Sequence, residues 1–138
     1  MSFRAVGAGG FRAAAAEYTR VRMPTPGCIF CRIASHEIPA RTVFEDDDVI
    51  AFHDLSPQAP VHALVIPKAH VTSLDDLTPE HGALHLSLLQ GARRAARELG
   101  LSDGGYRVVA NTGRDGGQSV FHLHLHVLGG RQLGWPPG

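Results

Sequence analysis

The segment Phe121-His122-Leu123-His124-Leu125-His126-Val127 alternates apolar residues with histidines. Successive side chains of a β-strand point to opposite faces of a sheet, so this period of two predicts a strand whose three histidines share one face. The apolar residues share the other face, and we expect them to pack against a helix. Neighbouring imidazoles on the open face of such a strand stand about 7 Å apart.

A row of imidazoles suits two kinds of chemistry. One is metal binding, because imidazole is a ligand for zinc and copper. The other is nucleophilic catalysis by a ring nitrogen that is held in one tautomer. A solvated row without function is the remaining alternative. The loop at residues 112–119 favours catalysis, because its glycines let backbone N–H groups converge on an anion, and Asn111 and Ser119 add side-chain donors.

Working outward from this segment, the sequence predicts one long helix and four further strands. The expected strands lie at residues 41–45, 49–53, 61–67, 106–111 and, for the histidine segment, 120–128. The long helix is predicted to begin after Thr78, with Pro79 in its first position, and to end at Gly100. Residues 28–33 predict a short helical turn. This pattern, mostly in hairpin order, indicates an α+β fold with a five-stranded antiparallel sheet.

Length and composition exclude several classes of protein. The chain has 138 residues, which suits a single domain. Lys+Arg and Asp+Glu are both 13, which argues against a broadly basic nucleic-acid-binding surface. No apolar run approaches the ~18 residues of a membrane span. Two cysteines are too few for a disulfide-rich secreted scaffold.

The first 23 residues differ from the rest of the chain. They contain four arginines, one acidic residue and runs of alanine and glycine. We expect a disordered extension or a mitochondrial targeting segment here, followed by a folded domain at residues 24–138. The expected location is the cytoplasm, or the mitochondrion if residues 1–22 are a transit peptide.

Residues 122–128, His-Leu-His-Leu-His-Val-Leu, resemble the His-x-His-x-His motif of the histidine triad (HIT) superfamily. Blocks at residues 44–47, 51–54, 56–60, 64–68, 115–120 and 129–138 resemble its Hint branch, the histidine triad nucleotide-binding proteins. The resemblance implies a HIT domain at residues 24–138 and a homodimer in which two five-stranded sheets join into one. It also implies binding of AMP or GMP and hydrolysis of their phosphoramidates and of aminoacyl adenylates.

The resemblance further implies a role for individual residues. His124 would be the nucleophile that becomes transiently nucleotidylated, and His126 and His62 would orient it or handle protons. Ser119 would act in catalysis and bind phosphate together with Asn111 and Gly117. Asp54 would bind the ribose, and Trp135 would lie near the partner subunit's site. The implied base pocket consists of Ile29, Phe30, Ile33, Phe52, His53 and Leu55. Catalysis of this kind requires no cofactor.

Cys28 and Cys31 form a C-x-x-C pair that many close Hint relatives lack. Other members of the superfamily use such a pair with two histidines to hold a structural zinc ion, and the matching histidines here are His70 and His122. Cys₂His₂ is a sound tetrahedral ligand set. The alternatives are two reduced thiols in an apolar packing role and a redox disulfide, for which no thioredoxin-like βαβ pattern is present.

Other functions fit the same motif. The second hypothesis is a dinucleoside polyphosphate hydrolase or a nucleotidyltransferase of the wider superfamily. The third is a nucleotide-sensing dimer that acts as a scaffold for other proteins. A metal carrier is the fourth.

Overall fold

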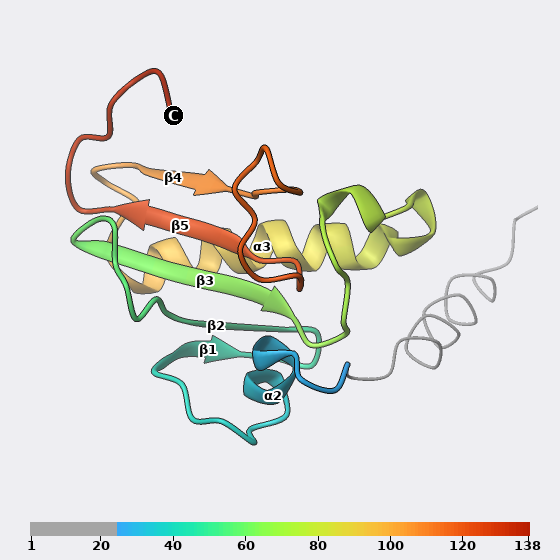
Figure 1. Ribbon diagram of the computed structural model, residues 1–138. Helices are drawn as coiled ribbons and strands as arrows, with labels where there is room; N and C mark the ends of the chain where they lie inside the picture. Colours follow the sequence, from blue (N-terminus) through green and yellow to red (C-terminus); the bar gives the residue numbers. More distant parts are fainter. Residues whose placement is uncertain (1–24) are drawn as a thin grey trace, which may run out of the picture.

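The structure is a computed structural model that describes residues 25–138, and the extension predicted at residues 1–23 lies outside them. The elements along the chain are α2 (Ile29–Ala34), β1 (Thr42–Glu45), β2 (Val49–His53), β3 (Val61–Pro67), the 3₁₀ turns η1 (Leu74–Asp76) and η2 (Pro79–His81), α3 (Gly82–Glu98), β4 (Tyr106–Val109) and β5 (Leu125–Gly129). Figure 1 shows this arrangement.

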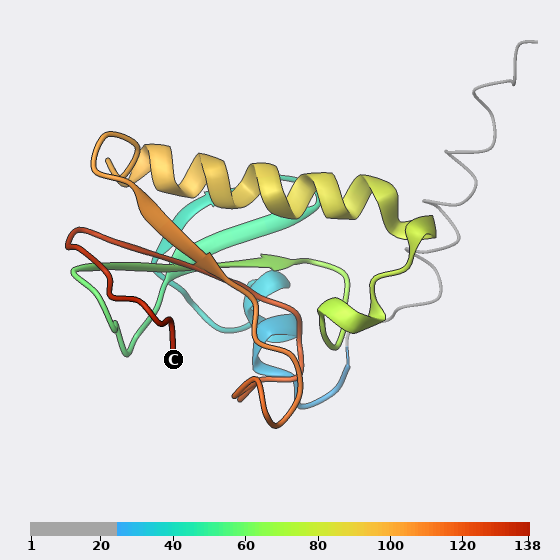
Figure 2. The same ribbon diagram turned by 90° about the horizontal axis from the view of Figure 1, so that it is seen from above.

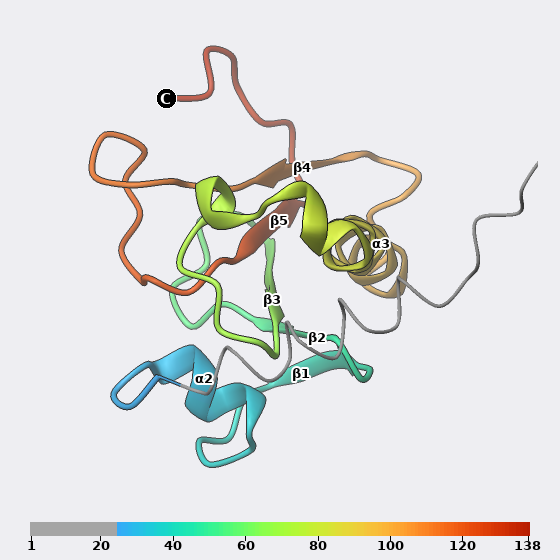
Figure 3. The same ribbon diagram turned by 90° about the vertical axis from the view of Figure 1, so that its right-hand side faces the viewer.

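The strands form one five-stranded antiparallel sheet in the order β1-β2-β3-β5-β4. The long helix α3 lies along one face of the sheet, and the short helix α2 lies against the other face (Figures 2 and 3). The predicted α+β class, the antiparallel sheet and the two helices are therefore confirmed.

Both faces of the sheet are buried, because alternate residues of the central strands point to different helices. Val49 and Ala51 of β2 belong to the cluster that contains Leu84 and Leu88 of α3. Ile50, Phe52, Leu64 and Ile66 belong to a second cluster with Phe30 and Ile33 of α2. The short helix α2 therefore gives the sheet a second hydrophobic core.

The long helix begins and ends close to the predicted residues. Thr78 forms a capping box with His81 around η2, and α3 continues from Gly82. Gly100, just past the end of α3, has a φ of 73°, a conformation that glycine adopts without a steric penalty. Among the described helices, none is both long enough and apolar enough to cross a bilayer.

The histidine segment and the neighbouring strand β4 depart from the prediction in several ways. Strand pairing begins at Leu125 rather than at residue 120, and β4 ends at Val109 rather than at residue 111. Leu123, Leu125 and Val127 pack on the α3 side as predicted, but Phe121, four residues before the first paired residue of β5, is 59% exposed. The prediction of an open histidine face was also wrong. His122 and His124 are only 0% and 5% exposed, and Phe30 of α2 packs against both rings.

Candidate active site and metal centre

A cavity of ≈ 460 Å³ opens between α2, β2 and the segment that leads into β5. This volume falls within the usual range of small-molecule sites. The cavity is lined by ten of the residues singled out in the sequence, namely Ile29, Phe30, Ile33, Phe52, His53, Asp54, Leu55, Ser119, His124 and His126. Apolar walls with a few polar groups suit a ligand with one flat apolar part and one charged part.

His124 lies at this cavity in a fixed protonation pattern. Its Nδ1 is 2.7 Å from the carbonyl oxygen of His122. A carbonyl only accepts hydrogen bonds, so Nδ1 carries the proton and the lone pair of a neutral ring lies on Nε2. Phe30 packs edge-on against the ring, with centroids 5.1 Å apart. The nitrogen with the lone pair is the one left available to a ligand.

Two further histidines form a hydrogen-bonded chain beside His124. The backbone N–H of Gln58 donates to Nδ1 of His62 at 3.0 Å, so a neutral His62 carries its proton on Nε2. That Nε2–H faces Nδ1 of His126 at 2.8 Å. His126 in turn has its own proton on Nε2, and its ring centroid is 4.9 Å from that of His124. The chain thus gives His126 an N–H donor at the cavity.

Burial favours the neutral form of these two histidines. Burial is the main cause that lowers the pKa of His126 to about 4, followed by the neighbouring His124 and His62 rings. Burial also lowers the pKa of His62, whereas the nearby Asp54 carboxylate acts in the opposite direction. The Oδ2 atom of Asp54 is 3.4 Å from Nε2 of His62, and Oδ1 accepts the backbone N–H of Ser56.

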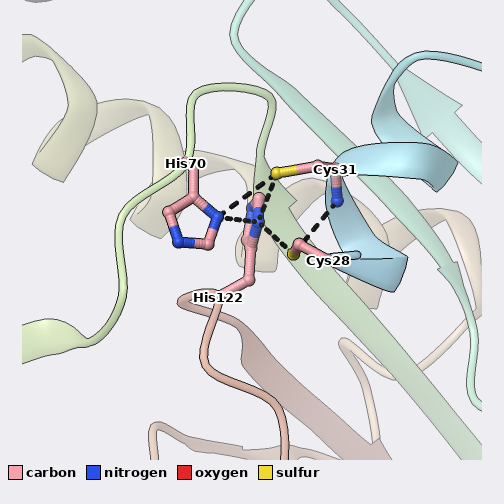
Figure 4. A group of neighbouring side chains, drawn as sticks. All are labelled: Cys28, Cys31, His70 and His122. Carbon is pink, nitrogen blue, oxygen red and sulfur yellow. Dashed lines mark hydrogen bonds between the residues drawn. The ribbon is translucent and has the colours of Figure 1, made fainter. Parts of the chain in front are cut away.

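Four side chains from three separate segments of the chain converge at a second site (Figure 4). Nδ1 of His122 lies 3.4 Å from Sγ of Cys28 and 3.5 Å from Sγ of Cys31. Nδ1 of His70 lies 3.2 Å from Sγ of Cys31 and 3.2 Å from Nδ1 of His122. The donors of a tetrahedral zinc ion, with bonds of about 2.0–2.3 Å, stand roughly 3.3–3.8 Å apart. The cluster therefore fits a metal ion such as zinc.

The protonation pattern of this cluster agrees with a metal site. Nε2–H of His122 donates to the carbonyl oxygen of Pro67 at 2.8 Å, which directs the lone pair of Nδ1 toward the thiols. Burial lowers the pKa of His122 to about 4, so the ring is neutral. Burial also raises the pKa of the Cys31 thiol to about 11. A bound cation would stabilise the thiolate and so offset the unfavourable effect of burial on its charge.

Asp54, His62 and His126 also bring donor atoms within 4.8 Å of one another. Here the protonation pattern argues against a metal ion. Because Gln58 already donates to Nδ1 of His62, Nε2 of the neutral ring carries a proton and has no lone pair to give. The group is therefore a hydrogen-bonded chain rather than a ligand set.

The chain is similar to known proteins over most of its length. Residues 35–133 match the HIT domain family. The chain belongs to the HIT family. It is 54% identical over 110 residues to an uncharacterized HIT-like protein of Synechococcus elongatus, covering 80% of this chain and 96% of that protein. It is 48% identical to Protein HitA of Neisseria gonorrhoeae over 102 residues, 74% of this chain and 94% of that one.

Solved HIT structures share the fold. The chain superposes on a HIT family hydrolase from Legionella pneumophila with a TM-score of 0.79 at 50% identity, covering 81% of this chain and 100% of that one. For a histidine triad nucleotide-binding protein from Candida albicans, the TM-score is 0.69 at 31% identity, covering 80% and 83% of the two chains.

The remaining predicted site residues of this HIT protein lie elsewhere. His62 is buried behind His126 and reaches the cavity only through that ring. Asn111, Gly117 and Trp135 are not among the residues that line the cavity, and the Trp135 side chain is 82% exposed. Their implied roles stay predictions. In the loop before the histidine segment, the Arg114 side chain is 93% exposed and pairs with Asp115.

Sequence reasoning missed part of the cavity wall. Ile38, Pro39, Ala40, Arg41, Leu64 and Val120 also line it. Residues 38–41 follow α2 in an irregular segment, so no periodicity could have identified them. Burial lowers the pKa of His53, and the positive charge of the Arg41 guanidinium lowers it further.

Proposed function

We propose that this HIT protein is a purine nucleoside phosphoramidase of the Hint branch. It would hydrolyse the phosphorus–nitrogen bond of AMP or GMP amides, and also aminoacyl adenylates, through a nucleotidyl-His124 intermediate. One observation carries the proposal. His124 lines a cavity of nucleotide-compatible size with its Nδ1–H on the His122 carbonyl, so Nε2 offers its lone pair to phosphorus.

The first step would form a bond from Nε2 of His124 to the α-phosphorus and break the bond from phosphorus to the amine. Negative charge that builds on the phosphoryl oxygens would be stabilised by donors at the cavity, the Ser119 hydroxyl and Nε2–H of His126. The His122 carbonyl would stabilise the positive charge that develops on the His124 ring.

The departing amine needs a proton. The His62–His126 pair is the group placed to give it, because a bound phosphoryl anion favours the protonated form of a nearby imidazole. In the second step, water would attack phosphorus, displace the His124 nitrogen and return a proton to the pair. The products would be the nucleoside monophosphate and the free amine, and the enzyme would be regenerated.

The rest of the cavity suits a purine nucleoside. Phe30 and Phe52 meet edge-on at 5.7 Å between centroids and form an apolar wall for a flat base. Asp54 is half-buried at the same cavity, where a carboxylate can accept hydrogen bonds from ribose hydroxyls. The likeness to the Candida albicans nucleotide-binding protein supports the Hint branch.

We also propose a structural zinc ion at Cys28, Cys31, His70 and His122, and a homodimer. The zinc proposal rests on the donor distances and on the proton pattern of His122. Within the described residues β4 pairs only with β5, and Tyr106 and Val108 on it are each 40% exposed. An unpaired edge strand with exposed apolar side chains is a surface that a second sheet can extend.

The test uses an adenosine 5′-phosphoramidate of tryptamine or lysine. We expect AMP release, and intact-mass analysis should show an AMP adduct that maps to His124. His124→Ala should abolish both. His36→Asn is the matched control, because His36 is an exposed histidine outside the cavity with a φ of 63°, which asparagine tolerates.

Three outcomes would contradict the proposal. Unimpaired turnover by His124→Ala would remove the nucleophile. Faster cleavage of diadenosine polyphosphates than of the phosphoramidate would favour the other hydrolases of the superfamily. AMP binding without any turnover or adduct would indicate a nucleotide-sensing protein.

A further inference from the structure

Gln118 is a buried amide in the loop between β4 and β5. Gln118 is only 8% exposed, whereas every other residue from 114 to 119 is exposed. The sequence predicts anion binding by the glycines of this loop and by Ser119, but it predicts no role for Gln118. A polar side chain that is buried in an exposed loop needs partners, and these partners define its role.

All the polar atoms of this amide are used within the protein. Oε1 accepts the backbone N–H of Gly113 at 2.9 Å. Nε2 donates to the carbonyl oxygens of Thr72 at 2.7 Å and Val120 at 3.1 Å. The two carbonyls need donors and the Gly113 N–H needs an acceptor, so only one orientation of the amide satisfies all three. Gln118 therefore has no donor to spare for a substrate.

The bonds of Gln118 hold the backbone next to Ser119. The backbone N–H of Gln118 also donates to the Gly113 carbonyl at 3.0 Å, so the loop is closed twice between residues 113 and 118. The bond from Nε2 to the Val120 carbonyl spans Ser119, and both Ser119 and Val120 line the cavity. The side-chain amide thus fixes the backbone on both sides of Ser119.

The bond to Thr72 connects this loop to the segment after β3. In that segment the carbonyl oxygen of Val71 accepts the backbone N–H of Leu123 at 2.6 Å. Leu123 directly precedes His124. The loop and α2 lie on the same side of the sheet (Figure 3). Gln118 thereby sets the position of Ser119 relative to the strand end that carries His124.

We infer that Gln118 is a positioning residue that holds Ser119 in register with His124, so that Ser119 meets the phosphoryl group as it is attacked. This inference rests on the proposed phosphoramidase function. Removing the amide leaves an N–H and two carbonyls without their partner and lets the loop shift. Misplacement by about 1 Å at a reacting centre can cost on the order of 10²-fold in rate.

The primary test compares Gln118→Met with Gln90→Met. Gln90 is an exposed residue of α3, so the control makes the same chemical change away from the cavity. We expect Gln118→Met to lower kcat and the rate of AMP adduct formation by tenfold or more, with less than a threefold change in the Kd for AMP. Gln90→Met should leave all three unchanged. A role confined to folding would lower Tm but leave the adduct rate per folded molecule at the wild-type value, and that result would overturn the inference.

A double-mutant cycle tests the route through Ser119. If Gln118 acts by placing the Ser119 hydroxyl, the kcat of Gln118→Met/Ser119→Ala should be close to that of the slower single variant. Fully multiplicative losses would overturn the inference. If Gln118→Met does not fold, Gln118→Glu takes its place, because it keeps the side-chain shape but cannot donate to both carbonyls. Wild-type kcat in Gln118→Glu would likewise overturn it.

The same experiment separates the two proposals. A wild-type protein that forms no AMP adduct refutes the proposed function and this inference together. A wild-type protein that forms the adduct at a rate equal to that of Gln118→Met refutes only the role of Gln118.

Discussion

The backbone carbonyl of His122 accepts the Nδ1–H of His124, while the ring of His122 belongs to the thiol cluster. One residue therefore joins the candidate metal centre to the candidate nucleophile. Phe30 adds a second connection, because its ring packs edge-on against both histidines at 5.9 Å and 5.1 Å between centroids. Loss of a ligand or of a metal ion at the cluster should therefore alter nucleotide binding in the cavity.

Removing the metal should weaken nucleotide binding. Helix α2 has six residues, too few for a stable isolated helix, yet it forms one wall of the cavity. We expect chelation to lower the affinity for AMP by about tenfold, a common size of coupling between sites. Zinc at about 1,000 times its Kd should raise the free energy of unfolding by about 4 kcal/mol. Calorimetry of AMP with and without zinc, and of zinc with and without AMP, should give the same factor.

Cys31→Ser is the control for this prediction. In that variant added zinc should change neither Tm nor AMP affinity. Equal AMP affinity in the zinc-loaded and zinc-free wild-type protein, both folded, would contradict the coupling.

Phe30→Ala should affect binding as well as stability. Phe30 and Phe44 are buried to a similar degree, with 7% and 5% exposure, but Phe44 lies in the core on the α3 side of the sheet. Either truncation should lower the free energy of unfolding by about 3–5 kcal/mol. Only Phe30→Ala should also weaken AMP binding, because only Phe30 lines the cavity. The measurement is urea unfolding together with AMP titration, and equal affinities in the two variants would refute the assignment of the wall.

Stability should fall in mild acid partly through His126. Its pKa is lowered to about 4 in the folded protein, from a usual value of 6.5. Between these two values the unfolded chain binds more protons than the folded chain, so the free energy of unfolding decreases as the pH falls from 6.5 to 4. The slope is at most about 1.4 kcal/mol per pH unit for each proton. Urea unfolding of His126→Asn across this range should show a shallower slope than wild type, and parallel slopes would exclude this source.

The edge strand β4 should determine whether the protein is a dimer or a monomer. Val108 on β4 is 40% exposed, and a lysine there would place a charge on the strand that we expect a second copy to cover. Light scattering after size exclusion should show a dimer for wild type and a monomer for Val108→Lys. Thr42→Lys, on the opposite edge strand β1, should remain a dimer. Loss of the dimer in both variants, or in neither, would rule out β4 as the joining edge.

The fold could be predicted because its signals are local. The apolar run of β3, the period of two in β5 and the cap at Thr78 depend on neighbouring residues. The exposure of Phe121 and the burial of His122 could not be predicted in this way. They depend on where strand pairing stops and on Phe30, a residue about 90 positions earlier in the chain.

The candidate site was predictable to the extent that it follows a family motif. The residues to which the resemblance gave catalytic or nucleotide-binding roles converge on one cavity, apart from His62, Asn111, Gly117 and Trp135, which do not line it. The wall at residues 38–41 is irregular, and the role of Gln118 follows from a tertiary contact with Thr72. Neither feature leaves a periodic or compositional signal in the sequence.

The cluster in Figure 4 also constrains when this protein can mature in the cell. Cys28 and His122 are 94 positions apart, and His70 lies between them. During translation the first two thiols emerge from the ribosome well before the last imidazole, at roughly 5–20 residues per second. The complete ligand set is therefore assembled only at the end of synthesis, so the proposed zinc ion could bind to all four ligands only after nearly the whole chain has been made.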